Sequence, residues 1–147
     1  MRRIRIFLIL CVIATCFCFG QLPHTFTQYT SEDGLSQNTI MSILQDGKGV
    51  MWFATWDGLY KFDGYTFSNY KAHPGDSIGL SNNRLDNIKE DRYGYIWVQS
   101  YNHQVYRFNP RLERFQAIPY DNYLSLDMYV LPCGDVWIIT VQNELIH

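Results

Sequence analysis

The stretch Asp46-Gly47-Lys48-Gly49-Val50-Met51-Trp52 returns later in the chain as Asp91-Arg92-Tyr93-Gly94-Tyr95-Ile96-Trp97, and this recurrence decides the fold. Both copies place Asp first, Gly fourth and Trp last. An Asp side chain can bind backbone amides two residues further on, and Gly tolerates the positive φ that ends a tight turn. Each stretch is therefore predicted to be a turn that leads into a strand bearing a tryptophan.

The similarity extends on both sides of this stretch. Upstream, Gly34-Leu35-Ser36-Gln37-Asn38 matches Gly79-Leu80-Ser81-Asn82-Asn83 at the same spacing of 45 residues. Downstream, Tyr60-Lys61-Phe62 matches Tyr106-Arg107-Phe108 at a spacing of 46, which indicates one residue inserted in a loop. A repeat with this order governs the interpretation of the whole chain.

Three units follow from this alignment. They cover about residues 34–70, 79–118 and 126–147, the last of them partial. The third copy is the weakest, because it keeps Gly134 and Trp137 but has Leu131 where the turn aspartate is expected. Residues that recur at one register are assigned a structural role in turns and packing: Asp46, Gly49, Trp52, Asp91, Gly94, Trp97, Gly134 and Trp137.

Each unit is predicted to hold four short strands. Segments rich in β-branched and aromatic residues lie between turn signals, at 40–45, 51–54, 59–62 and 67–70 and again at 96–98, 105–108 and 115–118. Four strands in a repeat of about 40 to 50 residues are typical of a propeller blade. The fold class is therefore all-β, an incomplete β-propeller of about two full four-stranded blades plus partial blades.

One segment before the first unit also fits the repeat. Phe26–Tyr29, followed by Gly34-Leu35-Ser36, mirrors Phe67–Tyr70, followed by Gly79-Leu80-Ser81. We expect Phe26–Tyr29 to be the outermost strand of a blade whose inner strands lie elsewhere. Propeller rings need about four to eight blades, and repeat units do not bury their faces alone. The chain is therefore expected to be a piece of a longer protein, with that protein's missing blades as partners.

The first twenty residues are predicted to be a helical signal peptide. Three arginines within the first five residues precede an apolar run, residues 6–19, which is too short for a spanning helix of about 20 residues. Cleavage is expected before Gln21, and the alternatives are an uncleaved anchor or a lipoprotein at Cys16. The domain at 21–147 is thus expected to be exported and periplasmic. Membrane contact would come only from an uncleaved signal or the parent's transmembrane helix.

Composition argues against several functional classes. After the signal, 9 basic and 14 acidic residues give a net charge of −5, so no nucleic-acid partner is expected for this segment. Cys133 is the only cysteine beyond residue 20, and no internal disulfide is predicted. There is no metal-type Cys/His cluster, phosphate loop or catalytic motif. We predict no catalytic residues, no metal and no cofactor, and therefore no enzyme.

The repeats resemble the two-component regulator propeller repeat of Bacteroidetes hybrid sensor kinases. The resemblance rests on Gly-Leu-Ser-x-Asn at 34–38 and 79–83, Asp-x-x-Gly-x-x-Trp at 46–52 and 91–97, and Asp57-Gly58-Leu59. It covers nearly all of the chain after the signal. There are departures: Ala54 and Gln99 stand where the family usually has glycine, and Asn102-His103-Gln104-Val105 replaces Asp-Gly-Leu in the second unit.

The resemblance implies a place in signal transduction. Full-length members have two periplasmic propellers, an immunoglobulin-like linker, a membrane helix and a cytoplasmic histidine kinase, often followed by receiver and DNA-binding regions. They sense glycan fragments and switch on polysaccharide-utilisation genes through a phosphorelay. This chain would be a fragment of such a ligand-sensing propeller, with a glycan oligosaccharide as its ligand. The alternative is a free-standing secreted carbohydrate- or protein-binding propeller that assembles its ring from several chains.

Candidate ligand residues lie where the first two units differ in an exposed loop. They are Trp56 and Asp57 in the first unit and Tyr101, Asn102 and His103 in the second. Aromatic faces can stack on sugar rings, and polar side chains can bind hydroxyl groups. Ordinary loop packing is the competing interpretation. Arg84 and Lys89 are weaker candidates for contact with an anionic glycan.

Overall fold

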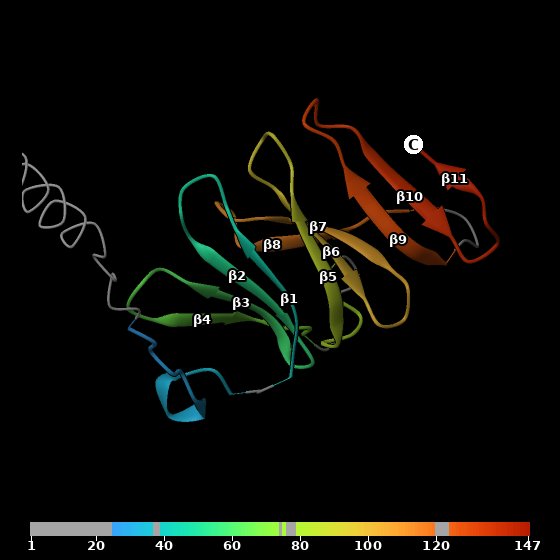
Figure 1. Cartoon of the computed structure of the whole chain (residues 1–147). Coiled ribbons are helices and arrows are strands. Elements are labelled where there is room, and N and C mark those ends of the chain that lie inside the picture. The colour runs from blue at the N-terminus through green and yellow to red at the C-terminus, as the bar shows by residue number, and fades with distance from the viewer. Residues whose placement is uncertain (1–24, 37–38, 74, 76–78, 120–123) are drawn as a thin grey trace, which may run out of the picture.

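The structure is a computed structural model that describes residues 25–36, 39–73, 75, 79–119 and 124–147. The predicted signal peptide, residues 1–20, lies outside the described residues. Three antiparallel sheets stand side by side (Figure 1). The predicted fold class, an all-β incomplete propeller, is confirmed.

Each sheet is a meander of strands that follow one another in sequence. Blade one consists of β1 (Ile40–Gln45), β2 (Met51–Thr55), β3 (Gly58–Phe62) and β4 (Phe67–Tyr70). Blade two consists of β5 (Leu85–Glu90), β6 (Ile96–Ser100), β7 (Val105–Asn109) and β8 (Arg114–Ala117). Blade three has β9 (Ser125–Val130), β10 (Val136–Thr140) and β11 (Leu145–Ile146). A short 3-10 helix, Ser31–Asp33, precedes blade one.

The recurring Asp-x-x-Gly-x-x-Trp stretch is held by a single carboxylate. Oδ1 of Asp46 accepts the amides of Lys48 and Val50, both at 2.9 Å, and Oδ2 accepts the indole N–H of Trp52 at 3.0 Å. Gly49 completes the turn with a φ of 85°. One side chain therefore shapes the turn and also satisfies the buried indole on the following strand.

Blade two repeats this arrangement, and blade three loses half of it. Asp91 accepts the Trp97 indole at 2.9 Å, whereas Leu131 of blade three offers no carboxylate. The backbone turn persists there, since the Gly134 amide donates to the Leu131 carbonyl at 2.8 Å. The ring of Trp137 instead stacks on His147, with 4.4 Å between ring centroids.

The core lies between blades rather than within one sheet. The face of blade one that carries Trp52 and Leu59 packs on the face of blade two that carries Ile88, Val98 and Phe108. The Trp52 and Phe108 rings meet edge to face at 5.6 Å. A second cluster joins blade two to blade three, around Val105, Met128 and Ile138. Each blade is thus stabilised chiefly by its neighbours.

The predicted bounds of the strands agree with the structure within two residues, except for the segment before blade one. β8 is Arg114–Ala117, one residue earlier than the predicted 115–118. The prediction that Phe26–Tyr29 form a strand is wrong here, because residues 25–30 carry no secondary structure and Phe26 is 93% exposed. A strand needs a paired neighbour for its backbone groups, and none of the described strands pairs with this segment.

Replacing Asp46 by Ala is expected to lower the free energy of unfolding by about 1–3 kcal/mol, because the Trp52 indole N–H would be left buried without an acceptor. Urea unfolding followed by tryptophan fluorescence measures the change. Asp63→Ala is the matched control: Asp63 also accepts turn amides, from Tyr65 and Thr66, but supports no buried donor. Equal losses in the two variants would contradict the assigned role of the indole bond.

Candidate functional site

The predicted ligand residues lie on one edge of the blades, which we call the lower rim. It comprises the β2–β3 turn (Trp56–Asp57), the β6–β7 turn (Tyr101–His103), and Ser36, Ser81 and Arg84 in the segments that lead into β1 and β5. The Asp-x-x-Gly turns occupy the opposite, upper edge in Figure 1. The antiparallel meander imposes this separation, because successive hairpin turns fall at opposite ends of a sheet.

A serine latch closes the lower rim of blade one. Ser36 Oγ donates to Asp57 Oδ2 at 2.9 Å and is hydrogen-bonded to the Tyr60 hydroxyl. Asp57 also pairs with Lys71 Nζ at 2.6 Å. The carboxylate predicted to bind ligand hydroxyls is therefore engaged by other residues of blade one, and it fastens the Gly-Leu-Ser segment to the β2–β3 turn.

The latch holds Asp57 in its charged form. Burial raises the pKa of the Asp57 carboxyl, but hydrogen bonds from Lys71 and Ser36, the Lys71 charge and the Tyr60 hydroxyl outweigh that effect. The pKa of Asp57 therefore lies below its ordinary value of 3.8. The same contact raises the pKa of Lys71. The two residues form an ion pair on the rim.

Blade two has a neutral version of the same latch. Ser81 Oγ lies 2.7 Å from the Tyr106 hydroxyl, and Asn102 Nδ2 donates to Ser81 Oγ at 3.4 Å. His103 follows as the inserted residue, with a φ of 65°. Its Nδ1 lies 2.9 Å from the Ser125 carbonyl oxygen, so it reaches toward blade three. Asn102 and His103 thus have partners within the protein, and their contact with a ligand stays a prediction.

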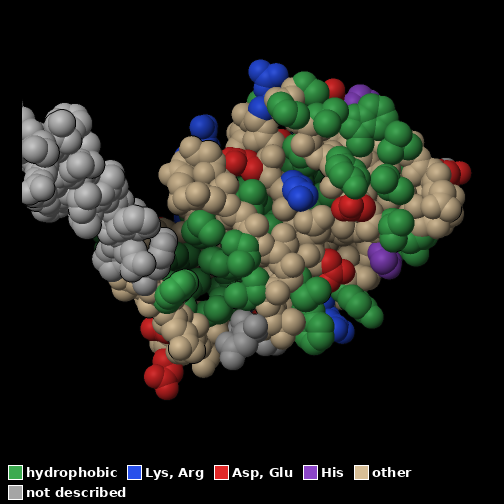
Figure 2. Space-filling model, viewed as in Figure 1, with side chains coloured by type: hydrophobic (Ala, Val, Ile, Leu, Met, Phe, Trp, Pro, Cys, Tyr) green, Lys and Arg blue, Asp and Glu red, His purple; other side chains and the backbone are tan. Residues whose placement is uncertain are grey.

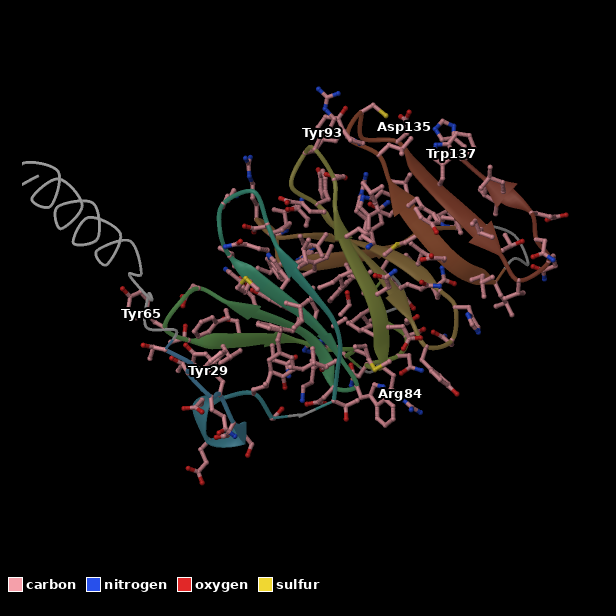
Figure 3. The ribbon with its side chains drawn as sticks, in the orientation of Figure 1. Tyr29, Tyr65, Arg84, Tyr93, Asp135 and Trp137 are labelled. Atoms are coloured by element: carbon pink, nitrogen blue, oxygen red, sulfur yellow. The ribbon has the colours of Figure 1, made fainter. Side chains whose placement is uncertain are left out.

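The two predicted aromatic residues, Trp56 and Tyr101, both contact Arg84, which is only a weaker candidate in the sequence. The Arg84 guanidinium carbon lies 4.2 Å from the Trp56 ring centroid and 4.4 Å from that of Tyr101 (Figure 3). Both rings are partly open to solvent, with exposed fractions of 41% and 55%. Lys89, the other weak candidate, is an exposed residue within β5 and is not part of the lower rim. One feature of the sequence points to Arg84: the equivalent position of the first unit holds Thr39, so the two units differ there.

Backbone hydrogen bonds fix this cluster across two blades. The Tyr101 amide donates to the Arg84 carbonyl at 2.8 Å, and the Gly58 amide donates to the Asn83 carbonyl at 2.8 Å. Gly58 is also required within blade one, since its φ is 110° and an added Cβ would lie 2.5 Å from the Tyr70 carbonyl oxygen. The segment before β5 therefore lies against the β2–β3 turn of blade one.

Metal sites, membrane-spanning helices and hollows are further features that bear on binding. No group of three or more His, Cys, Asp or Glu side chains suited to a metal ion occurs in the described part of the chain. Among the same residues no helix has the length and apolar character to cross a bilayer. A hollow of about 410 Å³ lies between the outer strands, lined in part by Tyr70, Lys71 and Glu113. The Tyr70 hydroxyl donates to Glu113 at 2.8 Å there.

The outer face of blade one is a second surface of interest. Ile43 is 59% exposed, whereas its repeat equivalent in blade two, Ile88, is 2% exposed. Met51, Phe53 and Phe62 are half-buried, although their equivalents Ile96, Val98 and Phe108 are fully buried. Figure 2 shows hydrophobic side chains gathered on the part of the surface formed by blade one. We call the set Ile43, Met51, Phe53, Phe62 and Phe67 the open face.

Tyr29 covers part of the open face from the side (Figure 3). Its ring meets those of Phe62 at 5.0 Å and Phe67 at 5.6 Å. Tyr70 of blade one meets Phe108 of blade two in the same manner, at 4.8 Å. Tyr29 therefore occupies the place that an outer-strand tyrosine takes between two blades, although its own segment is not a strand.

Comparison with known proteins bears on these repeats. The family model described as "Two component regulator propeller" matches residues 34–57. Residues 34–57 are thus similar to this repeat. A curated relative, "Histidine kinase P4" of Formosa agariphila, is 48% identical over 56 residues, which are 38% of this chain and 4% of that protein. Residues 34–57 contain Ser36 and Asp57 of the serine latch and the first Asp-x-x-Gly-x-x-Trp turn.

Solved structures share the propeller fold. The extracellular domain described as part of the hybrid two component system BT3049 from B. thetaiotaomicron has a TM-score of 0.67 at 24% identity, covering 85% of this chain and 20% of that one. The extracellular domain of BT4673 from the same organism gives 0.55 at 25%, covering 74% and 16%. A virginiamycin B lyase from Staphylococcus aureus gives 0.52 at 15%, covering 73% and 40%. The chain spans less than half the length of each of these proteins.

Acidification is expected to weaken the serine latch of blade one. The pKa of Asp57 is lower in the folded than in the unfolded chain, so the folded state binds fewer protons and this residue's contribution is complete above pH 3.8. The contribution is lost as the pH falls through the folded-state pKa. Asp57→Asn, which copies Asn102 of blade two, should make unfolding free energies measured by urea titration less dependent on pH below 5. An unchanged pH dependence would contradict this role.

Proposed function

We propose that this chain is a segment of the extracytoplasmic ligand-sensing propeller of a two-component regulator, and that the ligand is a glycan oligosaccharide. The observation that carries the first part is the 48% identity over 56 residues to a histidine kinase, beside the match of residues 34–57 to the propeller repeat. We further propose that the segment is exported to the periplasm and that its parent is anchored in the inner membrane. The kinase chemistry and phosphorelay belong to that parent.

The glycan part of the proposal is supported by the lower rim. Trp56 and Tyr101 present partly exposed rings from two adjacent blades, and rings of this kind bind the apolar faces of sugars while nearby polar groups orient the hydroxyls. Asn102, His103 and Asp57 border the two rings. The chain supplies binding groups here, while the response to binding requires the rest of the parent.

The open face supports a place inside a longer propeller. Its residues match, position by position, the face of blade two that blade one buries. We propose that a further blade of the same repeat packs on the open face, with a tryptophan at the position of Trp52. The missing blades of the parent are thus proposed partners of this segment.

Binding of a neutral oligosaccharide tests the proposed ligand class. Trp56→Ala and Tyr101→Ala are each expected to weaken affinity by about tenfold, the effect of losing roughly 1.4 kcal/mol of ring contact. Isothermal titration with a panel of purified oligosaccharides measures it. Tyr65→Ala is the matched control, because Tyr65 is 91% exposed in the β3–β4 turn, away from the lower rim. Equal effects of all three substitutions would argue against a rim site.

A pair of equivalent isoleucines tests the proposed blade partner. In the isolated chain Ile88→Ala is expected to cost about 2–5 kcal/mol of unfolding free energy, and Ile43→Ala less than about 0.5 kcal/mol. In a longer protein read from the DNA downstream of the His147 codon, the two costs should become similar. Denaturant unfolding of both proteins measures this. A stop codon followed by unrelated genes would contradict the proposal that this segment belongs to a longer protein.

One observation favours the alternative of a ring built from several copies. Blade three exposes Tyr129 and Leu145 beside Trp137 on its outer side, which is the kind of face that packs on the open face of blade one. Two such faces on one chain allow head-to-tail association. Size-exclusion chromatography with light scattering decides this case. A discrete oligomer would favour the free-standing module, and a monomer would favour the parent.

A further inference from the structure

Arg84 has a setting unlike that of any other arginine in the described part of the chain. Its guanidinium carbon lies within 4.4 Å of the centroids of two aromatic rings, those of Trp56 and Tyr101. Its Nε is buried and has no hydrogen-bond partner. No ion pair within 4.0 Å joins it to a carboxylate among the described residues. The remaining N–H groups in the guanidinium plane are therefore its open polar feature.

Comparison with the other stacked arginines sharpens the difference. Arg107 lies over Tyr95 at 4.7 Å and donates to Gln116 at 2.9 Å. Arg92 lies over Tyr93 at 5.4 Å and donates to the Cys133 carbonyl at 3.0 Å. Each of these two arginines has one stacked ring and one protein acceptor, whereas Arg84 has two rings and a buried Nε without an acceptor among the described residues.

The repeat argues against a purely structural role for Arg84. The serine latch and the Asp–Trp bond recur in both full blades. The position of Arg84 holds Thr39 in blade one, so the arginine is not required to build the loop. The stacking instead belongs to one boundary between two particular blades.

Nearby carboxylates do not neutralise Arg84. Asp57 is bound by Lys71 at 2.6 Å. Asp86 interacts electrostatically with Arg84 and His103, but burial is the larger effect and raises the pKa of Asp86. Neither of these carboxylates forms an ion pair within 4.0 Å of Arg84 among the described residues.

We propose that Arg84 binds an oxyanion, a carboxylate or sulfate group carried by the sugar ligand, through its in-plane N–H groups. A guanidinium edge matches such a group in a two-pronged geometry. The covering rings hold the guanidinium plane in place, so little side-chain freedom is lost on binding. The exposed parts of Trp56 and Tyr101 then flank the sugar that carries the anion. This inference rests on the proposed glycan-binding function and adds acidic sugars as the ligand class.

The test follows the indole N–H signal of Trp56 by NMR during titration of the whole chain. The probes are D-glucuronate and D-glucose 6-sulfate, with D-glucose as the neutral sugar and inorganic sulfate as the anion without a sugar. We expect saturable shifts with both acidic sugars and weaker ones with D-glucose. Arg84→Gln should weaken acidic-sugar binding by about 10- to 100-fold, the usual effect of a lost charge-assisted hydrogen bond. Arg107→Gln, the matched stacked arginine, should leave it unchanged.

The outcomes separate this inference from the proposed function. Equal binding of D-glucose and the acidic sugars, unaffected by Arg84→Gln, would overturn the oxyanion role and leave a neutral glycan site standing. No shift with either acidic sugar would also overturn it. If inorganic sulfate binds as tightly as the acidic sugars, the oxyanion role of Arg84 is supported and a contribution of the sugar ring to binding is contradicted. Arg84→Lys keeps the positive charge but loses the planar two-pronged guanidinium, so acidic-sugar binding intermediate between the wild type and Arg84→Gln would show that the loss in Arg84→Gln does not reflect a disturbed rim.

Discussion

The hydrogen bond from a turn carboxylate to a buried tryptophan indole is the contact on which the blades depend. Asp46 and Asp91 each bind two turn amides and one indole N–H. The tryptophan thereby enters the space between blades with its polar atom satisfied, which a buried donor requires. Blade three lacks the carboxylate, and its Trp137 turns to stack on His147 instead. The bond therefore links a local turn to the packing of neighbouring sheets.

The serine latch plays the corresponding part at the other end of each blade. It binds the segment that enters a blade to the turn between the second and third strands, with Asp57 charged in one blade and Asn102 neutral in the next. Because the latch occupies these polar side chains, the groups left to face a ligand are mainly aromatic. The distinctive element of the lower rim is the arginine that contacts two aromatic rings.

Unequal burial of equivalent residues explains why the chain suits a larger assembly. Ile43 and Ile88 hold the same position in the repeat, yet only Ile88 has a neighbouring blade to cover it. The hydrophobic stabilisation of a repeat protein resides largely in such interfaces. A surface of this kind exposes the hydrophobic residues through which neighbouring blades pack, and the outer side of blade three also exposes such residues.

The sequence alone determined the strands, the turns, the register of the repeat and the propeller class, because turn chemistry and strand alternation act over a few neighbouring residues. It also placed Trp56 and Tyr101 in equivalent turns. Only the tertiary structure decided that Arg84 contacts both rings, since this contact joins the β2–β3 turn, the β6–β7 turn and the residue before β5. Tertiary structure also decided that Asp57 faces inward and that Phe26–Tyr29 is not a strand. Strand pairing and side-chain partners depend on segments distant in sequence, and local pattern carries no record of which neighbours are present.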